Sequence, residues 1–424
     1  MPDPSSHPAA GDDALFYDWN RSERPVREVG VVDETLRDGL QSPSVQDPST
    51  PQKLALLQQA VALGVDGFAL GFPASRPRQF EDALRLAQEA ANQRFEVKLC
   101  CAARTLIADI EPVARIAQRA GVLIQVGMFI GASPLRQMAE GWSLSRALTL
   151  TEDAVRFAAR EGLEVLYVAE DATRTPPATL EQLYRTAIAC GARRVCVADT
   201  VGQATPEGAE NLIRFVRQLV DGIDPRIAIE WHGHRDRGLA VANCLAAWRA
   251  GAELCHGTAF GVGERCGNPP IELLLTNLAL LGHRKFDLSH LPDYAHAAQT
   301  ALGVPIPPNQ PVVGRDAFRT ATGAHAAALG KAMSRSDTWL ADRVFSAVPA
   351  SWVGRLQRIE IGPASGEANV LAWLSAHAVS PSTELVRAIL QAAKSRSRLL
   401  DDAEILAITR ETRPGARTAS SKSR

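Results

Sequence analysis

Eight short apolar runs, each followed by a longer segment with helical spacing, constrain the fold of this 424-residue chain more than any other feature. The runs are rich in Val, Ile and Leu, and they lie at residues 28–35, 64–72, 95–102, 122–130, 163–169, 193–199, 227–234 and 253–261. Continuous apolar runs of this length are typical of parallel strands that are buried on both faces. The sequence therefore predicts eight strands.

The segments between these runs have the spacing of helices. Residues 50–63, 77–92 and 206–220 place apolar side chains three or four positions apart, so each fits a crossover helix. Eight strand-helix units over about 250 residues match a closed TIM (β/α)8 barrel of the α/β class better than an open sheet. Because such barrels carry their active sites at the carboxyl ends of the strands, the polar residues after each run become the candidates for function.

The alternation stops near residue 290, which predicts a second unit. A Gly- and Pro-rich segment at 302–314 precedes helical patterns at 317–332, 350–356 and 386–394. We expect a flexible N-terminal arm, a barrel domain, a small and mostly helical C-terminal subdomain, and a disordered tail, at residues 1–27, 28–290, 291–408 and 409–424.

The composition excludes several classes of partner. Lys and Arg (46) nearly balance Asp and Glu (47), so no net field would attract nucleic acid or an anionic membrane. No apolar stretch reaches the ~18 residues that span a membrane, and the polar N-terminus does not resemble a secretion signal. The seven cysteines form no C-x-x-C pair. Reduced thiols and a cytoplasmic location are the expectation.

The first strand ends in a dense charged cluster that contains Asp33, Glu34, Arg37 and Asp38. Charges at a strand end are costly unless they are paired or put to use. Alone, this cluster is as consistent with a salt-bridge collar as with a functional site.

A second cluster favours the functional interpretation. His232 and His234 stand at the end of the seventh strand, where alternation points both side chains to one face. With Asp38 they would form a metal site, although a lone histidine is more often structural. An aspartate and two imidazoles leave about half of an octahedral shell open for substrate, and Mg²⁺, Mn²⁺ or Zn²⁺ would suit these ligands.

Five motifs together resemble the DRE-TIM metallolyase superfamily, which holds the isopropylmalate, homocitrate and citramalate synthases and hydroxymethylglutaryl-CoA lyase. They are D-x-T-L-R-D-G-x-Q, G-F-P, D-T-V-G-x-A-T-P, H-x-H-x-D-x-G-x-A-V-A-N and G-E-R-x-G-N, at residues 33–41, 71–73, 199–206, 232–243 and 263–268. The resemblance is to the isopropylmalate and homocitrate synthase family, and it implies a pyruvate carboxyltransferase-like barrel domain.

The resemblance also implies roles for individual residues. Asp38, His232 and His234 would bind the metal with Asn268 in or beside its shell, Arg37 would steady the developing oxyanion, and Glu170, Thr200 and Gln41 would join Arg37 in holding the 2-oxo acid. His325 ends a segment similar to one that carries a catalytic histidine, delivered across a homodimer interface in the synthases. On its own, His325 could equally be a surface or capping histidine.

Three positions depart from the family pattern. Arg235 stands where an Asn usually follows the second histidine, Ala69 where a Glu usually precedes G-F-P, and Arg136 where a His often follows S-P. Replacing a carboxylate by a methyl group and adding arginines are changes that can favour a different or a more acidic substrate. We expect the changes at Ala69 and Arg136 to touch the substrate rim, and the change at Arg235 to put a cation where an amide would stand near the metal.

The resemblance implies a metal-dependent Claisen condensation of acetyl-CoA, or another acyl-CoA, with a 2-oxo acid. A 2-isopropylmalate synthase of leucine biosynthesis is the first expectation. The segment at 359–366 resembles a subdomain that simple lyases lack, which favours a synthase. The alternatives are a homocitrate or citramalate synthase, a lyase that runs the reverse reaction, and a non-catalytic subunit that binds a 2-oxo acid or a partner protein.

Overall fold

The computed structural model describes residues 19–20, 28–283, 286–335 and 337–412. The expected N-terminal arm, apart from residues 19–20, lies outside the described residues, as do residues 413–424 of the expected tail. The chain divides into two compact units between Ile306 and Pro307.

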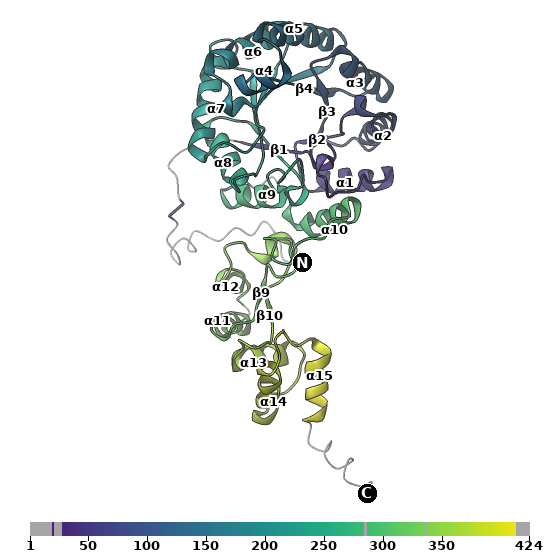
Figure 1. The fold of residues 1–424 in the computed structure, drawn as a ribbon. Helices are drawn as coiled ribbons and strands as arrows, with labels where there is room; N and C mark the ends of the chain where they lie inside the picture. The colour runs from purple at the N-terminus through teal and green to yellow at the C-terminus, as the bar shows by residue number, and fades with distance from the viewer. Residues whose placement is uncertain (1–18, 21–27, 284–285, 336, 413–424) are drawn as a thin grey trace. The chain divides into compact units, whose positions relative to one another are not determined.

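The first unit is a closed barrel of eight parallel strands (Figure 1). Each strand pairs with its neighbours in sequence, and β8 pairs with β1 to close the ring. The strands are β1 (Gly30–Asp33), β2 (Gly67–Ala69), β3 (Lys98–Arg104), β4 (Ile124–Gly131), β5 (Glu164–Glu170), β6 (Arg194–Asp199), β7 (Ala228–Gly233) and β8 (Leu254–Gly257). Every strand overlaps one predicted run, and the TIM-barrel prediction is confirmed.

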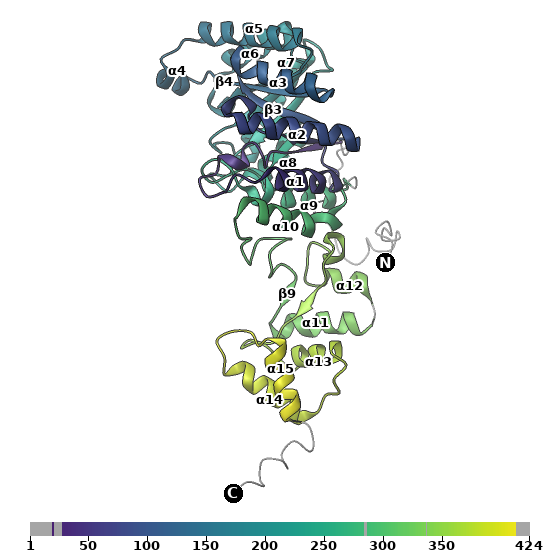
Figure 2. The same cartoon turned by 90° about the vertical axis from the view of Figure 1, so that its right-hand side faces the viewer.

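Helices surround the barrel, and Figure 2 shows α1, α2 and α3 side by side on its outer face. The helices of this unit are α1 (Thr50–Ala62), α2 (Pro77–Gln93), α3 (Ile107–Ala120), α4 (Pro134–Glu140), α5 (Leu144–Arg160), α6 (Pro177–Cys190), α7 (Pro206–Asp221), α8 (Ala240–Ala250), α9 (Ile271–Leu280) and α10 (Leu291–Leu302). Helix α7 illustrates how they begin, because the Thr205 hydroxyl accepts a hydrogen bond from the Gly208 amide and Pro206 occupies the first turn.

Helix α10 belongs to the barrel unit, although the sequence placed the boundary at residue 290. It packs against α1, and its buried Tyr294 reaches the end of β1. The Tyr294 hydroxyl donates to Asp33 Oδ2 at 2.7 Å and lies 3.2 Å from Thr35 Oγ1. Thr35 Oγ1 also accepts from the Ala259 amide at 2.9 Å, so these contacts fasten the start of the barrel to the loop after β8.

The second unit is mostly helical. It contains β9 (Arg319–Thr320), α11 (Gly323–Ser334), α12 (Thr338–Arg343), β10 (Arg358–Ile359), α13 (Glu367–Ala376), α14 (Thr383–Lys394) and α15 (Asp402–Glu411). Trp373, Leu374 and Ile389 are among the residues of its core. Helix α15 continues past residue 409, where the tail was expected. None of the helices in the described ranges is both long enough and apolar enough to cross a membrane.

Two helical predictions in this unit were partly wrong. The segment at 317–332 becomes helical only at Gly323, because Arg319 and Thr320 pair with β10 as a short parallel strand. The segment at 350–356 forms only a 3₁₀ turn, Ala350–Val353.

Candidate metal centre and active site

Asp38 is the point on which the predicted metal ligands converge. Its Oδ2 atom lies 3.0 Å from His232 Nε2 and 3.4 Å from His234 Nε2, and it accepts a hydrogen bond from Asn268 Nδ2 at 3.0 Å. All four residues are buried. They come from the turn after β1, from the end of β7 and from the loop after β8, so barrel closure brings together residues far apart in the sequence.

Local backbone geometry positions each of these side chains. The alternation of β7 directs His232 toward Asp38, and His234, just beyond the strand, points the same way because its amide donates to the Asp199 carbonyl. Two glycines let the loop after β8 bring Asn268 inward. A Cβ on Gly263 would stand 2.0 Å from Asn268 Oδ1, and one on Gly267 would stand 1.8 Å from the Gly261 carbonyl. Both glycines have positive φ.

The protonation states of Asp38, His232 and His234 suit a bound cation. Burial disfavours the charged form of Asp38, but Arg37 and then His232 hold the pKa of that carboxyl well below its usual range. Burial lowers the pKa of His232, and burial together with His232 lowers the pKa of His234 to about 4. A carboxylate beside two neutral imidazoles is the protonation state in which these groups bind metal ions.

Two buried polar atoms fit the same interpretation. His234 Nδ1 and Asn268 Oδ1 have no hydrogen-bond partner among the described residues. An unsatisfied buried polar atom typically costs about 1–3 kcal/mol, so such atoms often mark a position where a ligand completes the set. Asp38, His232 and His234 also present ligand atoms within 4.8 Å of one another. The donor set therefore fits a divalent ion.

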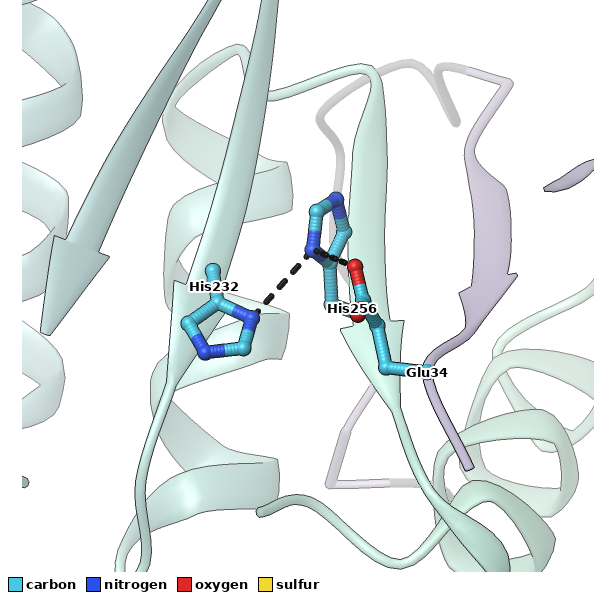
Figure 3. Close-up of side chains that lie close together, drawn as sticks. All are labelled: Glu34, His232 and His256. Carbon is cyan, nitrogen blue, oxygen red and sulfur yellow. Dashed lines mark hydrogen bonds and ion pairs between the residues drawn. The ribbon is translucent and has the colours of Figure 1, made fainter. Parts of the chain in front are cut away.

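Arg37 lies beside this group, held by a second set of buried charges. Its Nε atom donates to Glu34 Oε2 at 2.5 Å, and its Nη2 atom lies 3.5 Å from His232 Nδ1. Figure 3 shows His256 between His232 and Glu34, with its Nδ1 3.3 Å from His232 Nδ1 and 3.3 Å from Glu34 Oε1. His256 Nε2 bonds Glu230 Oε2 at 2.8 Å. Burial opposes the charge on His256, but Glu230 and Glu34 raise its pKa to about 9.

Glu34, His256 and Glu230 were not assigned a role from the sequence. Glu34 was only one of several acids after the first strand, and His256 was a single histidine inside an apolar run. A signal was present, because alternation along β7 and β8 puts Glu230, His232 and His256 on the inward side with the metal group.

A cavity of about 290 Å³ opens beside these residues. It is lined by Arg37, Asp38, His232 and His234 at one end, and by Glu170, Thr200, Gln41 and Arg136 elsewhere. Small or apolar side chains form much of the remaining wall, among them Ala69, Phe72, Ala102, Gly127, Phe129, Leu166, Val168 and Ala198. All of these residues belong to the barrel unit.

Comparison with known proteins assigns the chain to a family. The sequence model of the HMGL-like family matches residues 28–297, which is more than half of the chain. This protein belongs to the HMGL-like family.

Several curated relatives of this family member are condensing synthases by name. Homocitrate synthase AksA of Methanopyrus kandleri is 35% identical over 87% of this chain and 87% of its own length. A 2-isopropylmalate synthase of Methylacidiphilum infernorum is 34% identical over 72% of this chain, which spans 60% of that relative. The (R)-citramalate synthase CimA of Methanocaldococcus jannaschii is 30% identical, with 90% of this chain and 74% of that relative covered.

Solved structures of HMG-CoA lyases share the barrel of this HMGL-like protein. The enzyme from Bacillus subtilis superposes with a TM-score of 0.55 at 20% identity, covering 66% of this chain and 96% of that one. A lyase described as a complex with coenzyme A and 3-methylmalate gives a TM-score of 0.54 at 19% identity, covering 65% and 92%. At these identities the likeness supports the fold alone.

Two of the three departures from the family pattern line the cavity, and one does not. Ala69 and Arg136 are wall residues, as expected. Arg235 instead bonds the Cys266 carbonyl through Nε at 2.5 Å and is absent from the cavity wall. The loop after β8 therefore holds the Arg235 side chain through the Cys266 carbonyl, and the cavity wall does not include it.

The residues predicted to bind the substrate all line this cavity, but each makes different contacts. Glu170 Oε1 lies 3.3 Å from Arg136 Nε, while Thr200 Oγ1 accepts a hydrogen bond from the Asp171 amide at 2.8 Å. Gln41 follows the short turn after Asp38. Burial raises the pKa of Glu170, and Arg136 opposes that rise.

His325 lies in the second unit, on α11, and is exposed there. Its ring stacks on Phe345 with centroids 4.1 Å apart. Its catalytic assignment stays a prediction.

Proposed function

We propose that this protein is a divalent-metal-dependent acyltransferase that condenses acetyl-CoA, or another acyl-CoA, with a 2-oxo acid, in the manner of a 2-isopropylmalate synthase. The observation that carries the proposal is the buried group of Asp38, His232, His234 and Asn268, of which Asp38, His232 and His234 line one cavity together with Arg37. The names of the curated relatives support the same reaction class. We propose a cytoplasmic location, because the cysteines are expected to be reduced.

In this proposal Asp38, His232 and His234 hold the ion, with Asn268 at its edge. A bound Mg²⁺, Mn²⁺ or Zn²⁺ would polarise the keto group of the 2-oxo acid. The Arg37 guanidinium has two terminal nitrogens directed at the metal group, so it can donate to the oxygen that gains charge in the condensation.

Three residues would orient the 2-oxo acid, and His325 would move a proton. Glu170, Thr200 and Gln41 are polar residues of the cavity wall. His325 is proposed to act as a base on the methyl group of acetyl-CoA, delivered across the interface of a homodimer. Water then cleaves the thioester, which releases the CoA thiol and makes the reaction irreversible.

The charges of the cavity favour a 2-oxo acid with an uncharged side chain. Among the described residues, the three arginines of the wall are already paired: Arg37 with Glu34 and Asp38, Arg136 with Glu140 and Glu170, and Arg265 with Asp236. A second carboxylate on the substrate would need an unpaired donor or cation to replace its water. This favours an isopropylmalate-type substrate over the dicarboxylate that a homocitrate synthase takes.

The experiment is a panel of 2-oxo acids with acetyl-CoA, followed by thiol release, with Mg²⁺, Mn²⁺ and Zn²⁺ compared. Preference for a branched or linear apolar 2-oxo acid supports the proposal, and preference for 2-oxoglutarate supports a homocitrate synthase. Absence of thiol release, with cleavage of a hydroxyacyl-CoA, would make the protein a lyase. Silence toward all substrates, without metal binding, would leave the non-catalytic alternative.

The dimer prediction has its own test. Arg37→Ala and His325→Ala subunits are each expected to be inactive, because each lacks one half of a composite site. If His325 acts across the interface, mixed dimers recover one intact site and regain activity. Mixtures that stay inactive while gel filtration shows mixed dimers would refute this placement.

A further inference from the structure

The Arg37 guanidinium is fixed from one side by Glu34. The Glu34 carboxylate binds Arg37 Nε at 2.5 Å, while Arg37 Nη1 lies 3.6 Å from Asp38 Oδ2 and Nη2 lies 3.5 Å from His232 Nδ1. Because the guanidinium is planar, a carboxylate on Nε determines where the two terminal nitrogens point. Here they point at the proposed metal ligands.

Glu34 is itself held in place. It is only 5% exposed, and its second oxygen, Oε1, lies 3.3 Å from His256 Nδ1. His256 is anchored in turn by Glu230, whose Oε2 lies 2.8 Å from His256 Nε2. The carboxylate that orients Arg37 therefore has little freedom to move.

The register of the barrel relates Glu34 to the departure at Ala69. Strands β1 and β2 pair Val32 with Gly67 and Asp33 with Phe68. Glu34 is the residue after Asp33 and Ala69 is the residue after Phe68, so the register brings the two to the same level of the barrel. Both residues line the cavity. Ala69 is the position at which the family motif usually carries a glutamate.

We propose that Glu34 is a positioning residue that supplies, from the end of β1, the carboxylate that Ala69 does not supply from β2. Glu34 thereby holds Arg37 in the orientation in which it meets the reacting oxygen. This role rests on the proposed condensation. It also accounts for the methyl group at position 69, since a second carboxylate beside Glu34 would be a buried like charge.

A competing role for Glu34 is that of a metal ligand. Glu34, His232 and His256 form a second group whose ligand atoms lie within 4.8 Å of one another. However, both Glu34 oxygens are engaged, one by Arg37 and one by His256. These contacts favour positioning over ligation, and the bound-metal content of Glu34 variants separates the two.

The test moves the carboxylate from position 34 to position 69. Glu34→Ala removes the carboxylate, the double variant Glu34→Ala/Ala69→Glu returns one on the neighbouring strand, and Glu34→Gln keeps the volume without the charge. Glu164→Gln is the matched control, since this β5 glutamate bonds Gln125 at 3.1 Å and is absent from the cavity wall. For each protein, kcat, the KM for the 2-oxo acid and the bound metal are measured.

Glu34→Ala and Glu34→Gln should each lower kcat on the order of 10²-fold, the usual loss when a catalytic group is misplaced by about 1 Å. Bound metal should stay unchanged, the KM for the 2-oxo acid should change less than kcat because Glu170, Thr200 and Gln41 still hold the acid, and Glu164→Gln should match the wild type. The double variant should recover most of the lost kcat. A purely structural role for Glu34 would not be rescued from position 69.

Three results would overturn the proposal: wild-type kcat in Glu34→Gln, loss of the metal in Glu34→Ala, or a folded double variant no faster than Glu34→Ala. If the double variant does not fold, Glu34→Gln decides. If the wild type condenses no 2-oxo acid, the proposed function fails separately. Crystal structures then decide the positioning role, with Arg37 expected to leave its place in Glu34→Ala and a retained Arg37 orientation counting against the proposal.

Discussion

Gly127→Ala offers a sharp test of where the side chain of the substrate lies. Gly127 is on β4 in the wall of the cavity. A Cβ at this position would meet the Cys101 carbonyl at 3.8 Å and Leu166 Cδ2 at 3.9 Å, both ordinary van der Waals distances. The methyl group therefore fits the barrel without displacing its neighbours. The added methyl group therefore reduces only the volume of the cavity.

The expected effect is on selectivity rather than on folding. A single methyl or methylene in an apolar pocket changes selectivity by about 10- to 200-fold, or about 1–3 kcal/mol. Gly127→Ala should therefore lower kcat/KM for 2-oxoisovalerate by about that factor relative to pyruvate, whose side chain is smaller. Thiol release measured with both acids gives the ratio directly. The free energy of unfolding should not fall, since Gly→Ala at a strain-free position reduces the entropy of the unfolded chain.

Gly222→Ala is the matched control. Gly222 follows α7 with φ −71° and ψ −11°, and a Cβ there would lie 3.5 Å from the Gln218 carbonyl. It makes the same chemical change away from the cavity wall, so the selectivity ratio should stay at the wild-type value. An unaltered ratio in a well-folded Gly127→Ala would show that the substrate side chain does not occupy this part of the cavity, and the size argument would be lost.

Three further predictions follow from the same geometry. Arg37→Ala should fold normally and lose on the order of 10²–10³ in kcat, as is typical when an oxyanion donor is removed; steady-state kinetics beside a melting curve would expose any wild-type turnover. Removing divalent ions with a chelator should stop thiol release and lower Tm, because an ion bound only by the folded Asp38 group stabilises it; a Tm that does not respond to chelation and re-addition would argue against the metal site. Tyr294→Phe should lower the free energy of unfolding by about 1–3 kcal/mol, since buried Asp33 Oδ2 loses the phenol donor while Oδ1 keeps the Thr35 amide; a urea titration that superposes on the wild type would contradict this.

The barrel could be predicted from the sequence because parallel strands covered on both faces leave an unusually plain pattern. Val, Ile and Leu are frequent in these runs, and each run was followed by a helix-sized segment. The carboxyl ends of the strands then located the candidates. Asp38, His232 and His234 converge as expected because H-x-H at a strand end leaves few other geometries.

The remaining parts could not be predicted because they depend on neighbours that the sequence does not identify. The role of Glu34 requires knowing that β1 closes against β8, where His256 lies, and that Arg37 turns back toward it. The sequence indicated Arg235 only as a cation near the metal ligands and could not show that its side chain bonds the Cys266 carbonyl in the loop after β8. The short strand β9 could not be predicted because the strand it pairs with, β10, lies far along the chain.

The hydrogen bond from Tyr294 to Asp33 shows that the barrel unit needs the residues of α10. Any shortened version of the protein meant to stand alone must include α10, because a chain cut at residue 290 would leave the Asp33 carboxyl facing a gap where the phenol had been. Asp33 is five residues before Asp38, so the damage would start at the base of the proposed ligand turn. A fragment or a circular permutant of the barrel should therefore keep α10 and β1 together, and a protease that cuts between α10 and the rest of the barrel should destabilise it.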